Sequence, residues 1–370
     1  MGNLKLGFSF LIFCSCLLIS TSSAQSNNLP SQDHKNFPLF IFGDSIFDAG
    51  NNNYLKTAVA RANFWPYGET FFKCPTGRAS DGRLIPDFIA EYLKLPFIRP
   101  YLEPNNHHFT NGVNFASGGA GALVETFQGR VLDLKTQVTY FKKVEKQLGQ
   151  KLGNTETKAL LARAIYLFNN GGNDYASSPS LINSSSVFNH SRKKYVAMVI
   201  GNLTTVIEEI YETGGRKFGV LSIGALGLLP VVRAIEENVS SGFSEQVTIL
   251  AKLHNNALSN VLKKLQRRLQ DFKYLYFDTY SFTICRINNP SKYGFKVAKA
   301  ACCGSGPYRG LGTCGGIGNK EYELCTNPSE YLFFDGIHPT EKFNYQLAKL
   351  MWNGSHKLTR PYNLKTLVES

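Results

Sequence analysis

The segment FGDSIFDAGNN occupies residues 42–52 and directly follows an apolar run over residues 37–42. The run is typical of a buried strand, and the chain turns polar at Gly43, Asp44 and Ser45. In open α/β sheets, ligands bind at the carboxyl ends of the strands, so this order places the Ser45 hydroxyl at a binding edge. Ser45 is therefore a candidate nucleophile. The alternative is that its side chain only caps a helix that follows the strand.

Short apolar runs alternate with long amphipathic ones along the whole chain. The short runs predict strands over residues 39–42, 113–116, 164–168, 218–222 and 274–277. Apolar residues recur every three or four positions over 195–210 and 247–269, which predicts two long helices, the first ending at Gly214 and Gly215. Strands separated by helices predict a parallel sheet covered on both faces. We therefore expect a three-layer α/β/α sandwich that forms one domain over residues 25–370.

The first 24 residues have the pattern of a secretory signal peptide. Lys5 precedes a mostly apolar stretch at residues 6–19, and Ser-Ser-Ala at residues 22–24 offers a cleavage site. The stretch is shorter than the ~20 residues of a spanning helix, so we predict a secreted protein with no transmembrane segment. The candidate glycosylation sites, all Asn-x-Ser/Thr, are then expected at the surface: Asn183, Asn189, Asn202, Asn238 and Asn353.

The cysteines indicate an oxidising compartment. Cys14 and Cys16 lie in the signal peptide, and an even number remains: Cys74, Cys285, Cys302, Cys303, Cys314 and Cys325. We expect disulfides, concentrated between residues 285 and 325, with the pairing left open. No Cys-x-x-Cys pair occurs, so we predict no metal site and no cofactor.

The formal net charge of +13 favours contact with anionic cell-wall polymers or membrane surfaces. We do not expect nucleic acid as a partner, because the basic residues are dispersed and the chain is predicted to be secreted.

Acyl transfer needs a base for the serine and donors for an oxyanion, and both have candidates far from Ser45. Asp335 and His338 stand three apart in a Gly/Pro-flanked segment, where Asp335 can orient the imidazole and leave Nε2 for Ser45. Glycines after a predicted strand, Gly118 and Gly119, and the amide of Asn173 are candidate donors. Turn formation alone would also explain these glycines and the asparagine.

Four segments in this order resemble the plant GDSL esterase/lipase family of the SGNH hydrolase superfamily. They are Gly-Asp-Ser-Ile at residues 43–46, the segments 114–121 and 171–174, and Asp-x-x-His-Pro at 335–339. Ile46 stands where the family has the leucine of its name. The resemblance covers residues 37–355 and implies a flavodoxin-like, five-stranded parallel sheet.

The resemblance also implies roles for single residues. Ser45 would be the nucleophile, His338 the base and Asp335 the acid that orients it. The oxyanion hole would comprise the Ser45 N–H, the N–H of Gly118 or Gly119, and the Asn173 side chain.

We therefore expect a secreted serine esterase or lipase that acts on lipid or acyl esters, located in the apoplast or cell wall, with the vacuole as an alternative. Two other functions stay open. An acyltransferase would use the same acyl-enzyme with an alcohol in place of water, and a binding or defence protein would keep the fold without catalysis.

Overall fold

The computed structural model describes residues 37–177, 188–240, 242–315 and 321–370. The predicted signal peptide and Asn183 lie outside the described residues, and only the backbone is described at Asn189.

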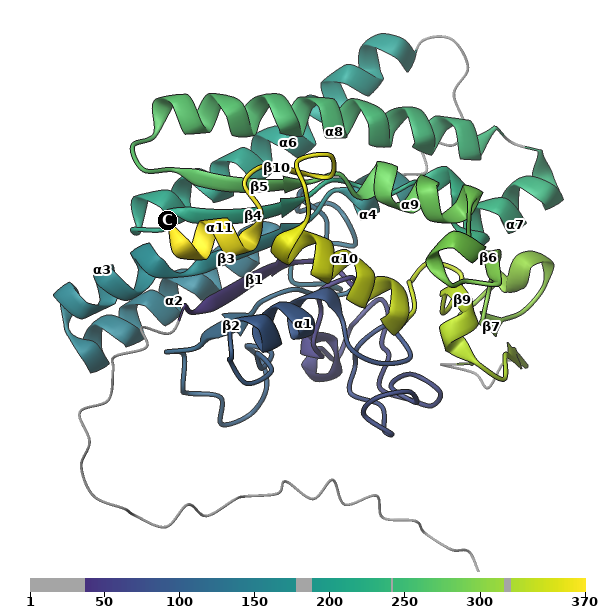
Figure 1. The fold of residues 1–370 in the computed structure, drawn as a ribbon, viewed down its shortest axis with the longest axis horizontal. Helices are drawn as coiled ribbons and strands as arrows, with labels where there is room; N and C mark the ends of the chain where they lie inside the picture. Colours follow the sequence, from purple (N-terminus) through teal and green to yellow (C-terminus); the bar gives the residue numbers. More distant parts are fainter. Residues whose placement is uncertain (1–36, 178–187, 241, 316–320) are drawn as a thin grey trace, which may run out of the picture. The chain divides into compact units, whose positions relative to one another are not determined.

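Within the described residues, six strands form the central sheet in the order β10-β5-β4-β3-β1-β2 (Figure 1). The first five strands in the chain are parallel and match the five predicted segments: β1 Leu39–Gly43, β2 Gly112–Asn114, β3 Ile165–Asn169, β4 Lys217–Leu221 and β5 Lys273–Phe277.

The sixth strand was not predicted. It is β10, Thr359–Pro361, which pairs antiparallel with β5 at the edge of the sheet. Its three residues carry no apolar run, and its proline is tolerated because an edge strand leaves one side unpaired. The central sheet is thus mostly parallel, with one antiparallel edge.

The parallel strands are mainly apolar because both faces of the sheet are covered. On β1, Phe40 and Phe42 lie in one core cluster, and Leu39 and Ile41 lie in the other. Successive side chains on a strand point to opposite faces, so one continuous apolar run supplies both layers of packing.

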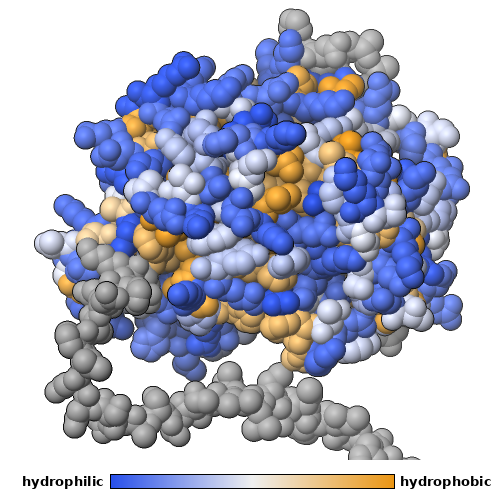
Figure 2. All heavy atoms as spheres, in the orientation of Figure 1, coloured by the Kyte–Doolittle hydropathy of each residue, from blue (hydrophilic) through white to orange (hydrophobic). Residues whose placement is uncertain are grey.

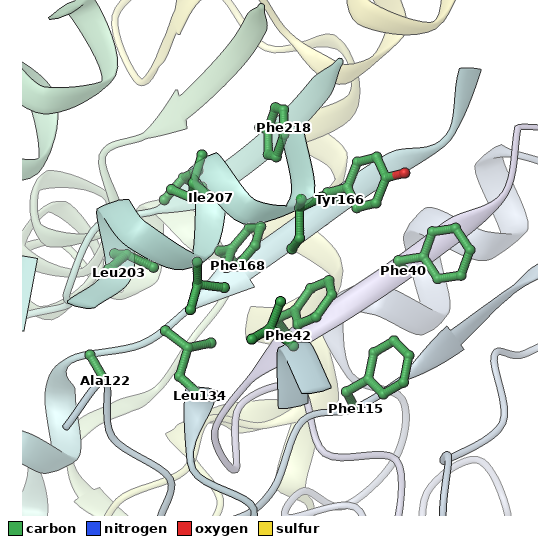
Figure 3. Packing of buried hydrophobic residues seen from close by; sticks show 14 of the residues in the cluster. Phe40, Phe42, Phe115, Ala122, Leu134, Tyr166, Phe168, Leu203, Ile207 and Phe218 are labelled. Carbon is green, nitrogen blue, oxygen red and sulfur yellow. The ribbon is translucent and has the colours of Figure 1, made fainter. Parts of the chain in front are cut away.

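Long helices cover the first face: α2 Leu134–Leu152, α3 Asn154–Arg163, α6 Phe188–Glu212 and α8 Phe243–Arg268. Helices α6 and α8 contain the two predicted amphipathic stretches. Figure 3 shows Phe42, Phe168 and Phe218 lying among the side chains of this layer. The Phe42 and Phe168 rings stack with centroids 4.9 Å apart, a favourable geometry for aromatic pairs.

The second face is covered by α1 Ile85–Tyr92, α9 Thr279–Asn288, α10 Glu341–Asn353 and α11 Leu364–Glu369 (Figure 1). Helices therefore lie on both faces, as the alternation of strands and helices predicted.

Shorter elements connect these layers. The helical ones are η1 Asn51–Tyr54, α4 Gly172–Ala176, η2 Leu226–Leu228, α7 Pro230–Val239, η3 Ser291–Tyr293, η4 Pro307–Arg309 and η5 Pro328–Glu330. Two small pairings join β6 Val297–Ala301 with β9 Tyr331–Phe333, and β7 Cys303–Gly304 with β8 Glu323–Leu324.

Two disulfides cross-link the region in which most cysteines occur, Cys302–Cys325 and Cys303–Cys314. This confirms that the segment is cross-linked and settles the pairing for four of the six cysteines. Cys74 and Cys285 lie outside both bridges.

Hydrophilic residues cover most of the face seen in Figure 2, and apolar side chains occupy small separate areas. Asn202, Asn238 and Asn353 are exposed, as glycosylation would require. Among the described residues, we find no helix with the length and hydropathy to cross a bilayer.

Candidate active site

Ser45 lies two residues beyond the end of β1. The neighbours of β1 in the sheet are β2 and β3, both parallel to it, so the segments that follow these three strands meet at one edge. Glycine at position 43 lets the ends of β1 and β3 lie close together, because a Cβ there would lie 2.9 Å from the carbonyl oxygen of Asn169.

No helix begins at Ser45. Residues 44–47 form a turn, closed by the Phe47 N–H donating to the Asp44 carbonyl at 3.1 Å, and the next element is η1. We therefore see no helix for the Ser45 side chain to cap, and no helix dipole acts on its hydroxyl from this segment.

The Ser45 hydroxyl instead meets His338. The distance from Ser45 Oγ to His338 Nε2 is 2.8 Å, and His338 Nδ1 lies 2.8 Å from Asp335 Oδ2. Asp335 is 1% exposed and His338 8%, whereas Ser45 is half-buried. The structure thus brings Ser45, His338 and Asp335 into one hydrogen-bond chain, although Ser45 and His338 are separated by 293 positions in the sequence.

A tight loop between β9 and α10 presents Asp335 and His338. The backbone N–H groups of Ile337 and His338 donate to Asp335 Oδ1 at 2.8 and 2.7 Å, and the Phe334 N–H donates to the His338 carbonyl at 2.7 Å. The loop therefore folds back on its own carboxylate, which keeps Asp335 and His338 on one side.

The two buried groups shift each other's pKa in opposite directions. Burial acts to raise the pKa of Asp335, but the charge and hydrogen bonds of His338 and the bond from Tyr67 outweigh it, and the pKa lies below its ordinary value. Burial acts to lower the pKa of His338, but Asp335 outweighs it and the pKa is raised. The carboxylate therefore favours the protonated form of His338.

The charge of Asp44 also acts to raise the pKa of His338. Burial raises the pKa of Asp44 to about 6, although hydrogen bonds from the Ile46 N–H and the Asn169 amide oppose the shift. Its role is structural as well, because it joins the turn after β1 to the end of β3.

The structure distinguishes the two candidate glycines. The Gly118 N–H already donates to Asp48 Oδ2 at 2.9 Å. Gly119 has φ +92°, and a Cβ there would lie 2.5 Å from Val59, so only glycine fits. Gly119 is thus the better candidate for the oxyanion donor.

Asn173 lies in the polar segment that follows β3, inside α4. Its Nδ2 donates to the Ala120 carbonyl at 3.0 Å, which uses one of its two amide hydrogens. The neighbouring Asp174 is fully buried and accepts from the Ala122 and Leu123 N–H groups at 2.8 and 3.0 Å. The segments after β2 and β3 are thereby fastened together beside Ser45.

Two side chains of the site, those of Asp48 and Tyr67, were not predicted from the sequence. Asp48 accepts hydrogen bonds from four backbone N–H groups, at Gly50, Asn51, Asn52 and Gly118. It therefore links the turn after β1 to the segment after β2 that contains Gly118 and Gly119, which we call the glycine loop. Polar residues crowded after a strand were a signal for such a role. Tyr67 donates to Asp335 Oδ2 at 2.6 Å, and no sequence pattern pointed to it.

A cavity of about 330 Å³ opens at Ser45, with Asn173 and Ile337 also in its wall. Apolar side chains from the end of β4 and from η2, α7, α8 and α10 make up much of the rest, among them Leu221, Leu226, Val232, Phe243, Val247 and Phe343.

Two buried polar side chains in this region take no part in the hydrogen-bond chain from Ser45 to Asp335. Asn170 lines the cavity, is 4% exposed, and its amide has no partner in the described residues. His254 is buried in α8 against the Tyr175 hydroxyl at 2.9 Å, and burial lowers its pKa to about 3. His254 therefore does not act as a second base.

Within the described ranges, we find no cluster of three or more His, Cys, Asp or Glu side chains that could hold a metal ion.

Comparison with known proteins gives consistent matches over the whole chain. Residues 39–351 match the family described as GDSL-like lipase/acylhydrolase. The chain is 50% identical to "GDSL esterase/lipase 1" of Arabidopsis thaliana over the full length of both. It is 46% identical to the "GDSL lipase" of Tanacetum cinerariifolium, covering 100% of this chain and 96% of that protein. It is 47% identical to "GDSL esterase/lipase 5" of Arabidopsis thaliana, over 98% and 95% of the two.

Proposed function

The chain belongs to the GDSL-like lipase/acylhydrolase family, and we propose that it hydrolyses carboxylic esters through an acyl-enzyme on Ser45. Relatives of about half-identical sequence over the full length are esterases and lipases by name, so the chain is a carboxylic-ester hydrolase. The observation that carries the mechanism is the hydrogen-bond chain from Ser45 Oγ through His338 to Asp335.

In the first half-reaction, His338 Nε2 accepts the proton of Ser45 as Oγ attacks the ester carbonyl. The negative charge that develops on the carbonyl oxygen is bound by the N–H groups of Ser45 and Gly119 and by the second amide hydrogen of Asn173. His338 then gives its proton to the departing alkoxide, and an alcohol leaves.

In the second half-reaction, His338 takes a proton from water, and the hydroxide attacks the acyl-enzyme. Collapse of the second tetrahedral intermediate returns the proton to Ser45 and releases a carboxylic acid. Asp335 stays ionised throughout and stabilises the imidazolium in both steps.

The cavity supports an aliphatic acyl group as the part of the ester that binds next to Ser45. Its wall is mainly aliphatic and aromatic, so each methylene that enters it is removed from water. Esters of fatty acids, including lipids, fit this surface better than esters of charged acids.

Two further properties are part of the proposal. The predicted signal peptide and the two disulfides support secretion to the apoplast or cell wall, since disulfides persist in oxidising compartments. The order of the five parallel strands, β2-β1-β3-β4-β5, supports a flavodoxin-like class of sheet.

Hydrolysis of p-nitrophenyl esters of increasing acyl length by wild type and Ser45→Ala tests the mechanism. We expect Ser45→Ala to lose at least about 10³-fold in kcat. Ser222→Ala is the matched control, because Ser222 is buried just beyond β4 but does not line the cavity. Equal turnover by Ser45→Ala and wild type would contradict the proposal.

A further inference from the structure

A small cluster of buried residues lies behind the loop that carries Asp335 and His338, and it belongs to neither main core. Its buried members, which we call the disulfide cluster, are Ala62, Tyr67, Ala79, Cys302, Cys303, Cys314 and Phe334. Cys325 packs against the cluster, so both bridges lie in this region, and the last member of the cluster immediately precedes Asp335.

Tyr67 is the member that reaches the catalytic acid. Its side chain is 1% exposed, and its hydroxyl donates to Asp335 Oδ2 at 2.6 Å, a short bond of the kind formed to an ionised acceptor. The backbone N–H of Cys314 also acts on the Tyr67 hydroxyl, in the sense that lowers its pKa. A backbone group of a disulfide-bonded residue therefore lies next to the bond from Tyr67 to Asp335.

The same disulfides hold the backbone that carries Asp335. The Cys303 N–H donates to the Phe334 carbonyl at 2.7 Å, and the Cys302 N–H donates to the Phe333 carbonyl at 3.0 Å. The Tyr67 ring packs edge-on against Phe334 with centroids 5.4 Å apart. Both the carboxylate and its peptide are thus fixed from one side.

We propose that Tyr67 is a positioning residue for Asp335, and that the Cys303–Cys314 bridge acts on the catalytic triad through it. The proposal rests on the proposed function of Ser45, His338 and Asp335. With Tyr67 in place, Asp335 Oδ2 is shared between the tyrosine and the imidazole, which fixes the carboxylate plane and moderates its attraction for the proton on His338.

The expected consequence for pH is specific. Without the tyrosine hydroxyl, the full charge of Asp335 acts on His338, so the imidazolium is favoured and the pKa of His338 rises. Asp44, the other carboxylate that acts on His338, is unchanged. Activity requires neutral His338, so the acid limb of kcat/KM should move to higher pH.

The test is the pH profile of kcat/KM for Tyr67→Phe on p-nitrophenyl butyrate. We expect kcat/KM to fall about 10- to 100-fold, the range for a hydrogen bond to a charged group, and the acid limb to move upward. Tyr166→Phe is the matched control, because that buried hydroxyl donates to the Leu161 carbonyl at 2.9 Å in the core. It should leave the limb in place. A Tyr67→Phe limb that coincides with wild type overturns the proposal.

A double-mutant cycle with Cys303→Ala/Cys314→Ala tests the link to the bridge. The cysteine pair should move the acid limb in the same direction as Tyr67→Phe and have little further effect in a protein that already carries Tyr67→Phe. Independent, additive effects would show that the bridge does not act through Tyr67. Ser45→Ala is run alongside: its retention of activity would overturn both the mechanism and this inference, whereas its inactivity with an unmoved Tyr67→Phe limb overturns this inference alone.

Discussion

As pH rises, the Asp48→Asn variant should gain stability relative to wild type. Burial raises the pKa of Asp48 from 3.8 to about 6, although four backbone N–H groups oppose the shift. Between these values the folded protein holds a proton that the unfolded chain has released, so wild type loses stability as pH rises from about 4 to about 6. A shift of about 2 pKa units corresponds to about 3 kcal/mol of unfolding free energy. Wild type loses this stability across the pH range, whereas the amide variant keeps it because an amide does not titrate.

The measurement is the free energy of unfolding in urea at about pH 4 and about pH 7, for variant and wild type. The difference between the two proteins should change by about 3 kcal/mol in favour of the variant across this range. Asp44 titrates in both proteins and cancels. A difference that stays constant with pH, or that changes in favour of wild type, would show that burial does not raise the pKa of Asp48.

The same substitution should impair catalysis. An asparagine that keeps its oxygen toward Gly50 and Asn51 turns its amide hydrogens toward the Gly118 N–H, where two donors then face each other. We expect the glycine loop to shift and kcat to fall about 10- to 100-fold, with a smaller change in KM. Asp133→Asn is the control for loss of one charge, because an amide caps α2 as well as the carboxylate does; its effects on stability with pH and on kcat should be smaller.

Three further predictions concern the site and its surroundings. Because Asp335 raises the pKa of His338, the acid limb of kcat/KM should lie above pH 6.5, and Asp335→Asn should lower both that pH and kcat. Val247→Trp, at a buried position in the cavity wall, should reduce hydrolysis of long acyl esters more than of acetyl esters in a chain-length series; an equal loss for all lengths would contradict the proposed acyl site. Replacing Cys302 and Cys325 by serine opens a loop with a sequence separation of 23 and should lower the unfolding free energy by about 3 kcal/mol in urea titrations; no loss would show that the bridge does not stabilise the fold.

The strands of the parallel sheet were predictable because they are buried on both faces and therefore consist mainly of apolar residues. The strand β10 was not, because an edge strand of three residues with a proline has no pattern of its own. Its place depends on the unpaired side of β5, which exists only in the assembled sheet.

The amino-acid sequence by itself determined the alternation of strands and helices, the polar ends of β1, β2 and β3, and the spacing that lets Asp335 orient His338, because each of these depends on residues close together in the chain. Only the tertiary structure decided the contact of His338 with Ser45, the bond from Gly118 to Asp48, the pairing of four cysteines and the bond from Tyr67 to Asp335. These contacts join segments that are distant in sequence, and they form when the parallel strands bring their carboxyl ends to one edge and α10 packs against the sheet. The physical reason is that local patterns specify which elements form, whereas the packing of those elements specifies which atoms meet.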